Sequence, residues 1–154
     1  MAISIYNVAD YFLNRIETEQ GSSITHLKLQ KLCYYAQAWY LAFEDEKLFG
    51  ERFEAWVHGP VNPDLFQTYR DYSWQNLPPV ENFNSTMFTA EQLDHLDEVW
   101  DVYGRYDGKF LEDLTHQEDP WIEARDGYTP SERCNVEIDT NRMKMYYRQK
   151  SQAQ

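Results

Sequence analysis

The chain of 154 residues has few cations, little cysteine and no long apolar run. Its 14 Lys and Arg residues stand against 26 Asp and Glu, which gives a formal net charge of −12. Because proteins bind nucleic-acid phosphates through clustered Lys and Arg, we do not expect DNA or RNA as a direct partner. The longest uncharged apolar stretch, residues 32–43, is shorter than the roughly 20 residues that a membrane-spanning helix requires. We therefore predict no membrane association.

Only two cysteines are present, Cys33 and Cys134, and they form neither a CxxC pair nor a disulfide framework. We expect both to be free thiols, as is usual in the cytoplasm. The first residues also lack the basic start and the uninterrupted apolar segment of a secretory signal. Together these features predict a cytoplasmic protein.

Short motifs of enzymes and cofactor sites are missing as well. The sequence contains no GxGxxG, GxxxxGK[ST], GxSxG or HExxH, and six glycines leave little material for a phosphate-binding loop. Glu91 and His95 are four residues apart on a predicted helix, but a zinc site needs three or four ligands. We interpret that helix face as solvated, and we predict no catalytic residues, no cofactor and no metal.

Aromatic residues, in contrast, are abundant. The chain has 5 Trp, 12 Tyr and 8 Phe and is 42% hydrophobic, which is far too much core material for a disordered acidic protein. We expect Tyr34, Tyr35, Trp39 and Tyr40 to lie mostly in the core. Other aromatics fall at predicted helix ends or edges, where Tyr and Trp often contribute to protein interfaces. These edge residues are Tyr6, Tyr11, Tyr69, Tyr72, Trp74 and Tyr106.

Hydrophobic periodicity predicts a mainly α-helical protein with one compact domain around a buried central helix. The first helix is predicted from Ser4 to about Glu19, and the central helix begins after the capping residue Thr25 and continues to Phe43. Later helices are predicted to begin at Asn62 and to span about 89–106, 110–115, 120–125 and 139–148.

One β-strand is predicted at residues 49–57, because Phe53 and Ala55 alternate with more polar neighbours. We expect this strand to pair with residues 47–49 in a small β-hairpin. Gly59 and the proline after it are predicted to end the strand, since both residue types interrupt regular structure.

Two pairs of polar residues stand out against this apolar pattern. Lys28 and Lys31 lie in the first turns of the central helix, where a cation opposes the helix dipole. We favour pairing with the chain's own carboxylates over contact with acidic groups of a partner. His58 and His116 each lie at an element boundary beside aromatic residues. Their roles, in descending order of expectation, are to lock a turn, to recognise a partner, or to act in catalysis.

Three segments resemble the signature of the Panacea domain, the SocA-like antitoxin family that also includes phage-associated GepA-type proteins. They read HLKLQKLCYYAQAWYLA at residues 26–42, FEAWVHGPV at 53–61 and LTHQEDPW at 114–121. The resemblance covers about residues 4–126, and the order and spacing of the three segments make it specific. We assign residues 1–127 to this domain and residues 128–154 to a C-terminal extension with a polar helix, packed on the domain or trailing it.

The resemblance implies an antitoxin of a toxin–antitoxin system, a protein without enzymatic activity that neutralises a cognate toxin by direct binding. The toxin is usually encoded by the adjacent gene. One alternative is a proteolytic adaptor that delivers the toxin to a ClpXP-type protease. A less expected alternative is a phage-associated enzyme that uses His58 or His116. The signature residues that we expect to contact a partner are Lys28, Lys31, Trp56, His58, Pro60, Tyr69, His116 and Trp121.

Overall fold

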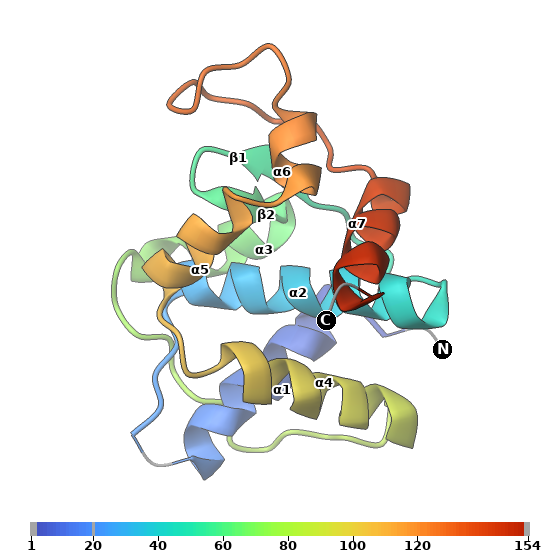
Figure 1. Ribbon diagram of the computed structural model, residues 1–154. Coiled ribbons are helices and arrows are strands. Elements are labelled where there is room, and N and C mark those ends of the chain that lie inside the picture. The colour runs from blue at the N-terminus through green and yellow to red at the C-terminus, as the bar shows by residue number, and fades with distance from the viewer. Residues whose placement is uncertain (1–2, 20, 153–154) are drawn as a thin grey trace.

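Helix α2 (His26–Glu44) runs through the middle of the molecule, and the other elements surround it (Figure 1). The computed structural model describes residues 3–19 and 21–152, and this part of the chain is mainly helical. The remaining elements are α1 (Ile5–Thr18), β1 (Glu54–Trp56), β2 (Gly59–Val61), α3 (Pro63–Tyr69), the 3-10 turn η1 (Arg70–Tyr72), α4 (Ala90–Tyr103), α5 (Gly108–Thr115), α6 (Asp119–Ala124) and α7 (Thr140–Gln152).

The central helix is buried on nearly every face, as its composition predicts. The Thr25 side chain caps it by accepting a hydrogen bond from the Lys28 backbone N–H. At the other end Asp45 adopts a left-handed conformation, with φ of 59°, and its N–H bonds back to the Leu41 carbonyl. Because α2 has neighbours all round, most of its stability comes from packing and not from helix propensity.

Helices α1 and α4 form a layer on one side of α2 (Figure 1). Each begins with a capping box, in which the cap side chain and the third helical residue satisfy each other's backbone N–H groups. Ser4 and Asn7 form the box of α1, and Thr89 and Gln92 form that of α4. These two helices confirm the sequence prediction, except that α4 ends at Tyr103, three residues earlier than expected.

The hairpin lies on the opposite side of α2 with α3, α5 and α6, and here the predicted pairing is wrong. Strand β1 pairs antiparallel with β2, and not with residues 47–49. Gly59 therefore begins the second strand instead of ending the first. The other edge of β1 is joined by residues 136–138, since the Ala55 N–H donates to the Val136 carbonyl.

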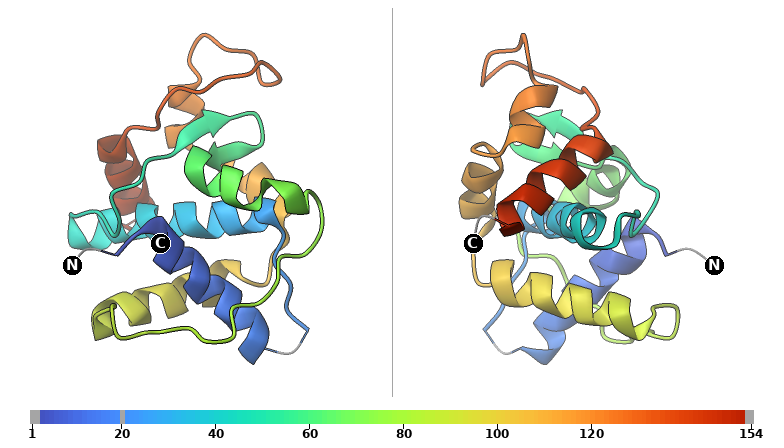
Figure 2. Two further views of the ribbon diagram at one scale, coloured as in Figure 1. Left: turned by 180° about the vertical axis from the view of Figure 1, so that it is seen from behind. Right: turned by 45° about the vertical axis from the view of Figure 1, so that its right-hand side comes forward.

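The C-terminal helix α7 packs across α2, as Figure 2 shows from two further directions. Met143 and Tyr147 of α7 are buried against the core. The helix continues to Gln152, four residues beyond the predicted end. Between α6 and α7 the chain forms a long irregular loop that projects away from α2 (Figure 1).

Several smaller predictions are decided by the same packing. Cys33 and Cys134 are both free and buried. His95, considered above as a metal ligand, instead places Nε2 2.9 Å from the Ala36 carbonyl oxygen and packs edge-on against Tyr40. None of the described helices is long and apolar enough to cross a membrane.

Candidate functional site

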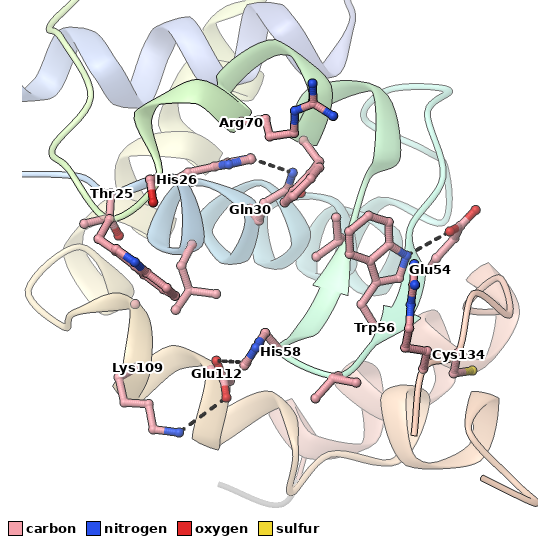
Figure 3. Close-up of a pocket in the computed structure, with 18 of the residues that line it drawn as sticks. Thr25, His26, Gln30, Glu54, Trp56, His58, Arg70, Lys109, Glu112 and Cys134 are labelled. Carbon is pink, nitrogen blue, oxygen red and sulfur yellow. Dashed lines mark hydrogen bonds and ion pairs between the residues drawn. The ribbon is translucent and has the colours of Figure 1, made fainter. Parts of the chain in front are cut away.

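A large open pocket lies beside the first turns of α2 (Figure 3). Its volume is about 1130 Å³, and its walls are mostly apolar. Five parts of the chain contribute to it: the start of α2, the turn of the hairpin, α3 with the segment after it, the start of α5, and the segment 133–135. Pockets of this size and character are the usual location of ligand or partner recognition.

Three rings form a continuous aromatic wall in this pocket. The ring of Phe66 lies 5.1 Å from that of His26 and 5.1 Å from that of Trp56, measured between centroids. Trp74 also lines the pocket, and it is 84% exposed. Such exposure is unusual for tryptophan, because its indole normally buries a large apolar area.

The polar groups on the α2 side are held by hydrogen bonds within the chain. The Gln30 side chain accepts from the Asn62 backbone N–H at 2.9 Å and donates to the Asn62 carbonyl at 3.2 Å. Its Nε2 also lies 3.2 Å from Nε2 of His26 (Figure 3). Burial lowers the pKa of His26 to about 4, so its imidazole is neutral at physiological pH.

A buried carboxylate, Glu112 of α5, forms the opposite side. Nδ1 of His58 donates to Oε1 of Glu112 at 3.1 Å, and Nζ of Lys109 lies 3.3 Å from Oε2 (Figure 3). Asp113 and His116 bring further ligand-type atoms within 4.8 Å of this carboxylate. However, Nζ of Lys109 also lies 3.3 Å from Asp113, so a metal ion here would have to displace the chain's own cation.

Lys31 lies beneath the pocket and is fully buried. Its ammonium donates to the Pro60 carbonyl at 3.1 Å, and burial lowers its pKa to about 7, against the opposing effect of Glu112. The hairpin turn closes over this side chain. Gly59 has φ of +103°, and a Cβ there would approach Lys31 Cε to 2.6 Å and Thr115 Oγ1 to 2.8 Å. The contact therefore requires glycine.

Lys28 is also buried, but it lies outside this pocket. Its ammonium donates to the Gly104 carbonyl at 2.5 Å and to the Ser23 carbonyl at 3.3 Å, and it lies 5.4 Å from the centre of the Trp100 ring. The prediction that Lys28 and Lys31 pair with carboxylates is thus wrong. Backbone carbonyls satisfy both, because the start of α2 packs against turns whose carbonyl oxygens point inward.

The third signature segment, residues 114–121, packs against the hairpin. His116 stacks on Trp121 with the ring centroids 4.1 Å apart, and burial lowers the pKa of this histidine. Nε1 of Trp121 donates to the Trp56 carbonyl at 2.8 Å, which ties α6 to β1. The guanidinium of Arg125 lies 5.0 Å from the Trp121 ring and donates to the Ala55 carbonyl.

The predicted edge aromatics differ in how far they are exposed. Trp74 lines the pocket, and Tyr6 and Tyr72 are partly exposed, in agreement with the edge prediction. Tyr11, in contrast, is buried in the core. Tyr69 is half-buried beside His26, with ring centroids 6.0 Å apart, and burial raises its pKa to about 12.

The structure therefore brings together only part of the predicted set. Trp56 and His58 line the pocket. Pro60 belongs to β2 of the hairpin but does not line the pocket, and Lys31, His116 and Trp121 pack against the hairpin. Other lining residues carry no signal in the sequence, because they come from segments that are distant along the chain. These are Phe66, Arg70, Glu112 and Arg133.

Comparison with protein families identifies the domain that carries most of this pocket. Residues 29–122 match the model of the family described as antitoxin SocA-like, Panacea domain. The chain belongs to this antitoxin family. Comparisons with curated proteins and with solved structures gave no match.

The match divides the pocket into two parts. Most of its lining, including the aromatic pair Trp56 and Phe66, lies within the Panacea match. The remaining lining residues, 25–27 and 133–135, lie outside the matched range. The pocket is thus formed mostly by the matched residues and is completed by one short segment before the match and one after it.

Proposed function

We propose that this protein is the antitoxin of a toxin–antitoxin pair and that it neutralises the toxin by binding it directly through the face around the pocket. The observation that supports this proposal is the pocket itself, which is open, mostly apolar and lined largely by residues of the Panacea match. Buried apolar pockets with exposed aromatic neighbours are typical anchors of protein interfaces.

The charge of the chain agrees with such a role. A net charge of −12 accelerates encounter with a basic partner and discourages association with acidic proteins. Trp74, with an exposed fraction of 84%, provides a large rigid side chain that loses little entropy on binding. We expect it to be among the strongest contacts.

Co-expression with the product of the adjacent gene tests the proposal. We expect the antitoxin to restore growth and to form a complex that survives size-exclusion chromatography. Trp74→Ala should weaken this complex by about tenfold or more. Phe43→Ala is the matched control, because Phe43 is also an exposed aromatic residue, 56% exposed, but lies at the far end of α2.

The outcomes separate the alternatives. Failure of both rescue and complex formation would contradict neutralisation by binding. Rescue accompanied by a shorter toxin half-life that depends on ClpXP would instead support a proteolytic adaptor. A pulse-chase measurement of the toxin in cells with and without the protease distinguishes the two.

A further inference from the structure

The rim of the pocket carries cations that the chain itself leaves without acidic partners. Among the residues that the structure describes, three of the seven exposed Lys and Arg side chains pair with a carboxylate within 4.0 Å, namely Arg52, Lys109 and Arg142. Within residues 3–19 and 21–152, neither Arg70 nor Arg133 has such a partner. Both are exposed, and both line the pocket.

Several other polar groups of the pocket already form hydrogen bonds within the chain. The Gln30 amide bonds to Asn62, and Glu54 accepts from Nε1 of Trp56 at 2.9 Å. Glu112 is held by His58 and Lys109. The two arginines are therefore the charged groups best placed to meet a ligand, and arginine binds carboxylates with paired hydrogen bonds.

We propose that the pocket accepts a segment of the toxin in which a large apolar side chain is followed or preceded by a carboxylate. The apolar side chain packs against the wall formed by His26, Trp56 and Phe66, and the carboxylate pairs with Arg70 and Arg133. This inference rests on the proposed function, since it names the part of the partner that is recognised. The two unpaired arginines of the rim and the aromatic wall together define the occupant.

The size of the pocket leaves room for a peptide segment. Its volume of about 1130 Å³ exceeds the roughly 300–1,000 Å³ of ordinary small-ligand sites. A net charge of −12 repels an acidic segment on average, and the two unpaired arginines at the rim offset this repulsion locally. A local charge pair on a surface of otherwise unfavourable charge helps to fix the position of the bound segment.

The rim also combines the Panacea match with a segment outside it. Arg70 lies within residues 29–122, whereas Arg133 belongs to the long loop between α6 and α7. The aromatic wall is therefore supplied mostly by the family domain, and the second cation by the C-terminal extension. Specificity for one toxin would then depend on the extension, while the apolar pocket is the common part.

Selection from a displayed random peptide library, with the full chain as bait, tests this proposal without knowledge of the toxin. We expect enriched peptides to carry an aromatic or large aliphatic residue beside Asp, Glu or a free C-terminal carboxylate. Synthetic versions should lose at least about tenfold in affinity for the double variant Arg70→Glu/Arg133→Glu. Replacing the acid in the peptide by Ala should give a similar loss on the wild-type chain.

Arg105→Glu is the matched control. Arg105 is exposed, undergoes the same change of charge and lies outside this pocket, over the ring of Tyr106. Its reversal should leave peptide affinity within about twofold, because Arg105 does not line the pocket and salt screens an exposed charge that makes no direct contact with the peptide. Circular dichroism tests whether each variant is folded. If the double variant is unfolded, the single arginine variants and the Ala-substituted peptide test whether the carboxylate pairs with these arginines.

Several results would overturn the inference. These are the absence of enrichment, enrichment of basic peptides, equal binding to the reversed rim, or saturable binding of a mononucleotide that excludes peptides. The co-expression assay decides neutralisation independently. Rescue with a complex that is insensitive to both arginines would refute the proposed occupant but leave the antitoxin function intact.

Discussion

Glu112 and Glu118 are both nearly fully buried close to the turn between α5 and α6, but their carboxylates have different surroundings. Glu118 faces the core, where Oε1 accepts from the hydroxyls of Tyr35 and Tyr147, each at 2.7 Å, and Oε2 from Lys150 at 2.9 Å.

Glu112 faces the pocket, and its partners His58 and Lys109 are both more than two-thirds exposed. A buried acid surrounded by donors from α2 and α7 joins parts of the fold, whereas one whose partners face solvent contributes to a surface. The same residue type thus joins elements of the core at one position and forms part of the pocket surface at the other.

The largest effect that we predict is on the core side. Glu118→Leu removes the acceptor of two buried hydroxyls and the partner of Lys150, and we expect it to lower the free energy of unfolding by about 3–5 kcal/mol. Glu112→Leu should cost clearly less, because water can replace the carboxylate for its exposed partners. Urea denaturation of the two variants provides the comparison, and equal losses would contradict it.

The second prediction concerns pH and Lys31. Its pKa is about 7 in the folded protein and near 10.5 in the unfolded chain, so above pH 7 the unfolded state binds the additional proton. Stability supplied by this group therefore rises between pH 7 and pH 9.5, by up to about 3 kcal/mol, and is constant below pH 7.

The Lys31 effect is measured as the difference between the wild type and Lys31→Met in urea denaturation at each pH. Using a difference removes the contributions of tyrosine and cysteine ionisation in the unfolded chain. A difference that does not change over this pH range would show that Lys31 keeps its charge in the folded protein.

The third prediction isolates the close contact under the hairpin. Gly59→Ala adds a Cβ that meets Lys31 and Thr115, whereas at Gly127, which also has positive φ, no atom lies within 4 Å of the added Cβ. Both substitutions incur backbone strain, so their difference reports the steric contact. We expect Gly59→Ala to be more destabilising by about 1–3 kcal/mol, measured by thermal unfolding.

The smallest predicted effect is on the pocket side. His58→Ala removes one exposed partner of Glu112 and should change the free energy of unfolding by less than about 1 kcal/mol. If neither imidazole is catalytic, toxin rescue should persist in His116→Ala, because His116 does not line the pocket, and in His58→Ala as long as that variant still binds the toxin. Loss of rescue in a folded, toxin-binding His58→Ala variant would favour the enzyme alternative.

Much of the fold was predictable because its signals are local. The capping box of Thr89 and Gln92, the start of α3 at Asn62 and the apolar periodicity of α2 each depend on neighbouring residues. The pairing of β1 was not predictable, since strand pairing depends on which segment the rest of the fold brings alongside. Gly59 indicates a turn in either case, and only the observed pairing of β1 with β2 shows which strands the turn connects.

The pocket was only partly predictable for the same reason. The resemblance to the Panacea family pointed to Trp56 and His58, which do line it. Arg70 and Arg133 belong to no motif, and they become notable only because the fold places both at the pocket without a carboxylate within 4.0 Å. Trp74 was predicted as an edge aromatic, but its place on this rim depends on the segment after η1, which pairs with the residues before α2 through the Thr25–Asn76 bridge.

The sequence by itself determined the helices, their caps, the aromatic core and the antitoxin family, because these follow from short-range periodicity and from segments that can be compared directly. Only the tertiary structure decided which polar groups are buried and which remain free. Burial depends on contacts between distant segments, so Lys31 meets a backbone carbonyl and Glu118 meets two tyrosines, while Arg70 and Arg133 are left facing an open pocket.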